Sequence, residues 1–127
     1  MEKEFVPYEQ ALALKELGFD GDCCQAYHIN GENELSEFYS NPPIVDEWLK
    51  KLPFIKAPLW QQAFRWFWNT QGLYVEFFVD DDQTFGFLIS RFVEEGRMDY
   101  PSKRGYSNPE IAEFNCLKAL IEMVKSI

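Results

Sequence analysis

An aromatic segment at residues 60–68, Trp-Gln-Gln-Ala-Phe-Arg-Trp-Phe-Trp, constrains the fold more than any other part of the chain. Aromatic side chains bury large areas and dominate protein cores and interfaces. Apolar residues recur here at the i, i+3, i+4 and i+7 spacing of a helix with one buried face; they are Leu59, Trp60, Ala63, Phe64, Phe67 and Trp68. We therefore predict a helix over 58–71, ended by Gly72, with Arg65 and Trp66 on its less buried side.

Two apolar runs after this helix predict a β-hairpin. Leu73–Val79 and Phe85–Val93 are rich in aromatic and β-branched residues, and Asp80–Thr84 between them has the composition of a turn. The first run is apolar on both faces, since Tyr74 and Phe78 alternate with its other large side chains. A sheet of this kind needs a second cover, which helices or another copy of the protein could supply.

The remaining segments predict further short elements. Proline, glycine and capping signals set their limits. We expect a helix from Pro7 to Gly18, short strands over Cys23–Ile29 and Leu35–Tyr39, a short helix over Ile44–Leu52, an extended linker over Pro53–Pro58, a loop over Glu95–Tyr106, and a last helix opened by the capping box Ser107–Glu110. This order predicts an α+β fold over residues 1–127, a single domain in which a three- or four-stranded antiparallel sheet packs against three or four helices.

The net charge of −9 is concentrated near the start of the chain. Residues 1–48 hold eleven acids and two bases, whereas residues 49–127 hold ten of each. Direct binding to nucleic acid is disfavoured, because phosphate contacts need clustered Lys and Arg. The acidic third fits a solvated face, a surface for a basic partner, or a mimic of nucleic acid.

Nothing in the sequence directs the chain to a membrane or to secretion. No apolar run approaches the roughly 20 residues of a membrane helix, and the segment Met-Glu-Lys-Glu-Phe-Val-Pro is not a secretory signal. The three cysteines suggest no disulfide framework. We expect a cytoplasmic protein that does not bind membranes.

The reactive side chains form no recognisable catalytic or metal-binding motif. Cys23, Cys24 and His28 lack a fourth ligand and match no common zinc spacing, and Cys116 lies beside core positions of the last helix. The three aspartates of residues 80–82 lack the spacing of a calcium loop and are typical of a turn. We therefore predict no catalytic residue, no metal and no cofactor.

Three stretches carry a resemblance to a known family. They are Phe5–Glu9 with Leu14–Asp20, then Ala57–Phe67, and the end from Glu113 through Cys116 to Glu122. In these stretches the chain resembles a family of small uncharacterised proteins encoded by phages and prophages of gut bacteria, and similarity is least over Gln25–Lys56. The resemblance implies an origin in a bacterial host cell but no activity, ligand or partner.

The leading functional hypothesis is a protein-binding module without catalysis, acting on a host or phage protein. The acidic first third, the many aromatics and the lack of catalytic motifs favour it. The alternative is a small-molecule-binding module or minor enzyme with an aromatic-lined pocket, for which Arg65, Trp66, Tyr27 and His28 are the candidate binding residues. A third hypothesis, nucleic-acid mimicry, needs the acids of residues 2–47 to lie on one face of the protein. A homodimer is also possible, because a second copy of the chain would cover the apolar sheet.

Overall fold

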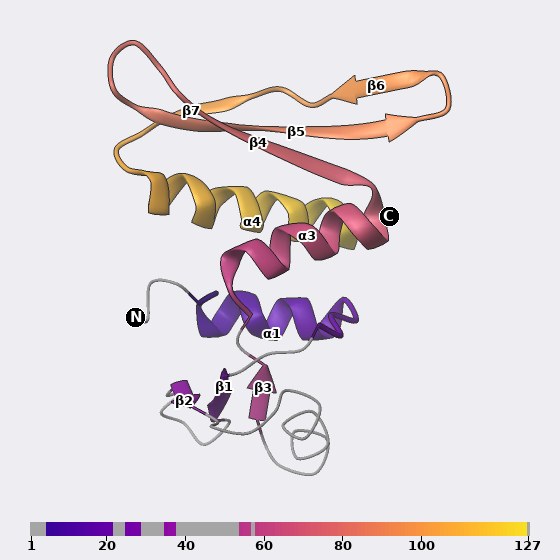
Figure 1. The fold of residues 1–127 in the computed structure, drawn as a ribbon, viewed down its shortest axis with the longest axis vertical. Coiled ribbons are helices and arrows are strands. Elements are labelled where there is room, and N and C mark those ends of the chain that lie inside the picture. Colours follow the sequence, from indigo (N-terminus) through magenta and orange to yellow (C-terminus); the bar gives the residue numbers. More distant parts are fainter. Residues whose placement is uncertain (1–4, 22–24, 29–34, 38–53, 57, 127) are drawn as a thin grey trace. The chain divides into compact units, whose positions relative to one another are not determined.

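The computed structural model describes residues 5–21, 25–28, 35–37, 54–56 and 58–126. The chain forms two compact units, residues 1–63 and 64–127, and the division falls inside helix α3 (Trp60–Gln71). Figure 1 labels the elements of both. The predicted α+β class is confirmed, because the described residues form three helices and antiparallel sheets of three and four strands. The single-domain assignment stays a prediction.

The first unit combines helix α1 (Tyr8–Glu16) with a small antiparallel sheet. Strand β1 (Gln25–His28) lies between β2 (Leu35–Glu37) and β3 (Phe54–Lys56). Helix α1 packs against β3 and buries Ala11 and Leu14. Gly18 has a φ of 96°, which confirms the predicted left-handed end of this helix.

Strand β3 forms within the segment that was predicted to be an extended linker, Pro53–Pro58. Its extended backbone pairs with β1, with Tyr27 opposite Ile55. The two predicted strands near residues 23–39 are confirmed over Gln25–His28 and Leu35–Glu37. The predicted helix over Ile44–Leu52 lies outside the described residues, as do Cys23 and Cys24.

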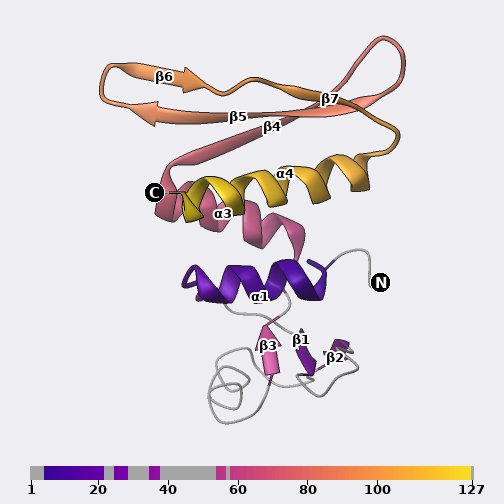
Figure 2. The same ribbon diagram turned by 180° about the vertical axis from the view of Figure 1, so that it is seen from behind.

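The second unit is built around the predicted hairpin. Strand β4 (Leu73–Val79) pairs antiparallel with β5 (Phe85–Val93), with Phe77 opposite Phe87. The other side of β5 pairs with two short strands, β6 (Gly96–Asp99) near one end and β7 (Lys103–Tyr106) near the other. Figure 2 shows helix α4 (Pro109–Lys125) running along one face of this sheet.

The predicted loop over Glu95–Tyr106 is wrong over most of its length, because β6 and β7 form there and only Glu95 and the middle, residues 100–102, stay outside the strands. Gly, Pro and, to a lesser degree, Lys are poor strand formers, so composition alone indicates a loop. Pairing with the long strand β5 overrides that preference, and between β6 and β7 the N–H of Tyr100 still donates to the carbonyl of Ile89 at 2.9 Å. Edge position explains why Pro101 is tolerated in this connection.

The core of the second unit lies between the sheet and its helices. α4 contacts β5 and β7 and buries one side of its length. The fully or almost fully buried apolar residues are Phe67, Leu73, Phe87, Ile89, Ala112, Cys116, Leu117, Leu120 and Ile121. The predicted start of α4 shifts by one residue, since Asn108 rather than Ser107 caps the helix by accepting from the N–H of Ile111 at 2.9 Å.

Candidate functional site: the outer face and outer edge of the β4–β7 sheet

The two faces of the β4–β7 sheet differ in exposure. Leu73, Phe87 and Ile89 share the face that packs on the helices of this unit and are buried. Tyr74 and Phe92 lie on the opposite face, here called the outer face, and are 43% and 47% exposed. Alternation along a strand sends successive side chains to opposite faces, so the register fixes this division.

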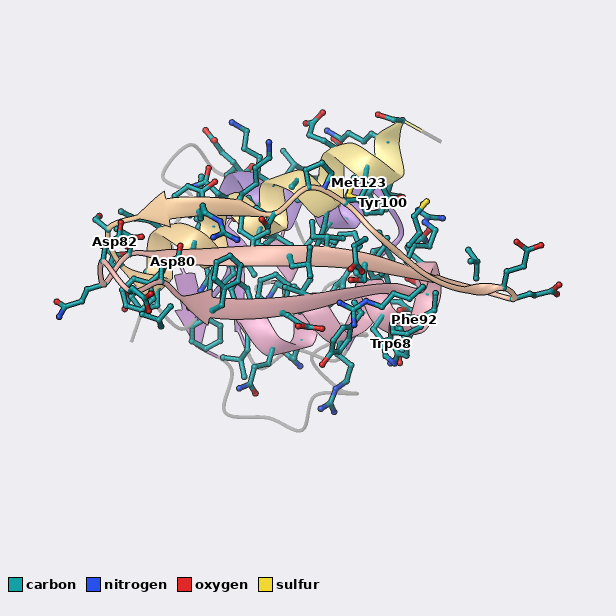
Figure 3. All side chains as sticks on the ribbon, turned by 90° about the horizontal axis from the view of Figure 1, so that it is seen from above. Trp68, Asp80, Asp82, Phe92, Tyr100 and Met123 are labelled. Carbon is teal, nitrogen blue, oxygen red and sulfur yellow. The ribbon has the colours of Figure 1, made fainter. Side chains whose placement is uncertain are left out.

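Three aromatic rings meet where α3 passes into β4. Trp68 packs edge to face against Tyr74, with ring centroids 5.7 Å apart, and against Phe92 at 5.4 Å. Tyr74 and Phe92 are 6.2 Å apart. Figure 3, which looks onto the outer face, shows Trp68 beside Phe92. We call these three residues the aromatic cluster.

The end of α3 explains how the cluster assembles. Gly72 has a φ of 67°, a left-handed conformation that only glycine adopts easily, and it lets the chain pass directly from α3 into β4. Trp68 in the last turn of the helix therefore reaches Tyr74 near the start of the strand. Trp68 remains 44% exposed despite its two ring contacts. A large aromatic surface is thus fixed in place yet accessible.

A network of charged side chains lies beside the cluster on the outer face. Arg97 bonds to Asp99 at 2.6 Å and to Glu76 at 3.3 Å, and the hydroxyl of buried Ser90 donates to Asp99 at 2.7 Å. The bonds from Arg97 and then from Ser90 hold the pKa of Asp99 below its ordinary value. The bond to Asp99 likewise raises the pKa of Arg97. These groups are engaged with one another and link β6 to β5 and β4.

Arg104 lies at the hairpin end of the outer face, opposite the end that holds the aromatic cluster. Its guanidinium lies over the Phe78 ring, 4.9 Å from the centroid, and bonds to Asp80 at 3.3 Å. Phe78 in turn crosses the backbone of Gly86, where a Cβ would come within 2.6 Å of the ring and 2.5 Å of the carbonyl oxygen of Lys103. Gly86 is therefore the residue that allows β7 and Phe78 to approach β5 this closely.

The predicted hairpin turn over Asp80–Thr84 is confirmed. Asp82 accepts from both the N–H and the hydroxyl of Thr84, at 3.2 and 2.6 Å, and these bonds lower the pKa of its carboxyl. The N–H of Asp80 donates to the carbonyl of Thr84 at 2.8 Å. Asp81 and Asp82 are exposed, and neither has an ion-pair partner in the part of the chain that the structure describes.

Strand β4 forms one edge of this sheet, and among the described residues it pairs only with β5. In an antiparallel ladder, hydrogen-bonded residues alternate with residues whose N–H and C=O point the other way. Asp80 and Thr84 form a hydrogen-bonded pair, and such pairs recur at every second residue. The N–H and C=O groups of Phe78, Glu76 and Tyr74 therefore point toward β5. The N–H groups of Val75, Phe77 and Val79 therefore point away from β5, along what we call the outer edge.

The prediction for Trp66 is wrong. Trp66 is 8% exposed and packs edge to face on fully buried Phe67 with ring centroids 5.0 Å apart, whereas Trp68 is exposed. The buried face of α3 runs through Ala63, Trp66 and Phe67, which also fit i, i+3 and i+4 spacing. Trp66 is thus a core residue; Arg65 is exposed, as predicted.

The four predicted binding residues lie in different units. Tyr27 and His28 belong to β1 of the first unit, while Arg65 and Trp66 belong to the part of α3 in the second. The aromatic cluster was not predicted, because its members come together only through the hairpin register and the turn at Gly72. The apolar character of Tyr74 on the second face of its strand was the one signal of it.

The remaining candidates from the sequence are the buried cysteine of α4, possible metal ligands and the acids of residues 2–47. Cys116 is fully buried, as predicted, and burial raises the pKa of its thiol far above the ordinary value. Across the described ranges, no group of His, Cys, Asp and Glu side chains could hold a metal ion. Most acids of residues 2–47 lie outside the described residues, so the mimicry hypothesis stays a prediction.

Comparisons with known proteins identify no relative of this chain. No family model, no curated protein and no solved structure matches this chain. None of the described helices combines the length and the apolar character that a membrane crossing demands.

Proposed function

We propose that this protein is a cytoplasmic, phage- or prophage-derived accessory protein that binds a host or phage protein and performs no catalysis. The observation that carries the proposal is the aromatic cluster, in which Trp68, Tyr74 and Phe92 are each more than two-fifths exposed. Binding hot spots are enriched in Trp and Tyr, which supply large rigid contact areas. The cluster has this composition and is accessible from the outer face.

The surroundings of the cluster also support binding rather than chemistry. Arg97 bonds to both Asp99 and Glu76, so these groups brace the sheet and form a polar rim instead of presenting a group to a substrate. A polar rim around an aromatic centre is the usual anatomy of a protein interface. The phage origin rests on the sequence resemblance described above.

The test is affinity capture from host and phage-infected lysates with quantitative mass spectrometry. Wild-type protein is compared with the variant Trp68→Ala/Phe92→Ala and with the control Ile111→Ala/Phe114→Ala, which removes equally exposed apolar side chains from α4. We expect one partner that the control retains and the cluster variant loses. Absence of any specific partner, or equal retention by all three proteins, would contradict the proposal.

A native mass measurement separates a second copy of the chain from a different partner. A dimer that Trp68→Ala/Phe92→Ala converts to monomer would show that the cluster is a self-association surface, contrary to the proposal. We expect a monomer at micromolar concentration, because a chain with a net charge of −9 repels its own copies.

A further inference from the structure

The outer edge of β4 lacks the features that normally protect an edge strand. Natural sheets blunt their edges with short strands, proline, lysine or β-bulges, since unpaired N–H and C=O groups are a template for another strand. β4 has seven residues, contains no proline and no lysine, and keeps an unbroken register with β5 from Leu73 to Val79. Its one charged residue, Glu76, already bonds to Arg97.

Exposed apolar side chains flank this edge on both faces. Val79 is 63% exposed and Phe77 44% exposed on the face shared with Leu73, and Tyr74 is exposed on the outer face. Phe77 is held by an edge-to-face contact with Phe64, with ring centroids 5.4 Å apart. A strand added here would gain backbone hydrogen bonds from Val75, Phe77 and Val79 and apolar contacts from alternate side chains.

The negative charge near the outer edge favours a basic strand from a partner over a second copy of this chain. Residues 73–84 contain Glu76, Asp80, Asp81 and Asp82 and no Lys or Arg. Arg97, which is shared with Asp99, bonds to Glu76, and Arg104 bonds to Asp80, whereas Asp81 and Asp82 at the hairpin end of β4 have no ion-pair partner among the described residues. A basic side chain on the added strand would complement them, whereas a second copy of this acidic chain would bring no such group in β4.

We propose that the outer edge of β4 binds an extended, positively charged segment of a partner protein by β-strand addition. The segment pairs with Val75, Phe77 and Val79, alternates apolar side chains over both faces, and places Lys or Arg beside Asp81 and Asp82. This inference rests on the proposed function, because it assumes a protein partner, and it adds the mode of recognition and the chemistry of the partner.

The test begins with a displayed library of random peptides of about nine residues, long enough to span the strand. Full-length protein is compared with Val79→Pro, which removes an outward N–H, and with Val79→Ala, which removes the same side chain but keeps the N–H. We expect wild type to enrich net-positive, alternating sequences, Val79→Ala to enrich them more weakly because it loses one apolar contact, and Val79→Pro to lose them. Enrichment of neutral or acidic peptides, no enrichment at all, or equal enrichment by the proline variant would overturn the proposal.

The best peptide is then synthesised in two N-methylated forms, each blocking every second amide. Strand addition uses one edge of the peptide, so we expect one form to lose about tenfold or more in affinity and the other to bind like the parent. Equal loss in both forms would overturn strand addition. Asp81→Lys should weaken binding of the parent by about fivefold, and an unchanged affinity would refute the placement of the basic residue.

The outcomes separate this inference from the proposed function. A lysate partner that depends on Trp68 and Phe92 but is retained by Val79→Pro refutes strand addition and leaves the binding function standing. Edge-specific peptides together with a lysate that yields no specific partner refute the proposed function while supporting the edge as a strand-binding site. A partner lost with both Val79→Pro and the cluster variant supports both.

Discussion

The two edges of the β4–β7 sheet are built in opposite ways. One edge consists of β6 and β7, two four-residue strands separated by Pro101, with an irregular register opposite Phe85 and Phe87 and with Lys103 and Arg104 in the strand. The other edge is the continuous, seven-residue β4. The first carries the usual devices against unwanted pairing, whereas β4 contains no proline, lysine or bulge and pairs with no second strand among the described residues. The same sheet therefore has one protected edge, formed by β6 and β7 and here called the closed edge, and one unprotected edge, formed by β4.

The largest effect should come from proline substitutions on the two sides of the β4 backbone. Phe78→Pro removes an N–H that bonds to β5, whereas Val79→Pro removes one that points outward. Relative to the matched alanine variants, we expect the first to lower the free energy of unfolding by about 3 kcal/mol or more and the second by less than about 1 kcal/mol. Urea denaturation measures both. Equal costs would show that the outward N–H of Val79 is also paired.

Substitution of Gly86 should damage the closed edge specifically. The Cβ of alanine would meet the Lys103 carbonyl oxygen and the Phe78 ring well inside van der Waals contact. We expect Gly86→Ala to lower the free energy of unfolding by about 1–3 kcal/mol, because a backbone atom of β7 must move. Amide exchange should rise over Lys103–Tyr106 more than over β4. A variant as stable as wild type would refute the close approach of β7 at this position.

The aromatic cluster joins the start of β4 to the end of β5, and its removal should have a smaller effect. Trp68→Ala loses two edge-to-face contacts of a half-exposed side chain, which costs about 1–2 kcal/mol. The Tyr74 and Phe92 ring resonances should shift in NMR spectra, and those of Phe87 stacked on Tyr106 should not. Shifts of equal size at both places would mean that the variant rearranges the whole sheet.

Acid should loosen the closed edge slightly and leave β4 unaffected. The pKa of Asp99 is lower in the folded protein than in the unfolded chain, so its carboxylate adds stability above the ordinary carboxyl value of about 3.9 and loses it as the pH falls through the lowered pKa. Amide exchange of Arg97–Asp99 should therefore accelerate at the acid end of a titration. Asp99→Asn should abolish that change; if the acceleration persists in this variant, another group causes it.

The sequence predicted elements better than it predicted surfaces. Pro7, Gly18, Gly72 and the aspartate turn mark helix and hairpin ends by local backbone chemistry, and the structure confirms them. The strands β6 and β7 were missed because their residues favour a loop until β5 supplies a partner. The burial of Trp66 and exposure of Trp68 were reversed, since a helix that is aromatic on most sides fits more than one stripe and only packing chooses between them.

The candidate site was the least predictable part for the same reason. Trp68, Tyr74 and Phe92 meet only through the turn at Gly72 together with the register of β4 and β5, and no local pattern encodes that register. The outward-pointing backbone of β4, which pairs with no second strand among the described residues, is equally invisible in sequence, because it depends on where β6 and β7 pair. What the sequence did indicate was the apolar character of both faces of β4, which is the basis of both proposals.

Hydrogen exchange of the β4 amides tests the central claim most directly. In the full-length protein alone, measured by NMR at neutral pH, we predict alternation along the strand. The amides of Tyr74, Glu76 and Phe78 should be protected by β5, and those of Val75, Phe77 and Val79 should exchange at least about tenfold faster. Uniform protection of all six amides would contradict the account, because it would show that the outer edge of β4 is already paired.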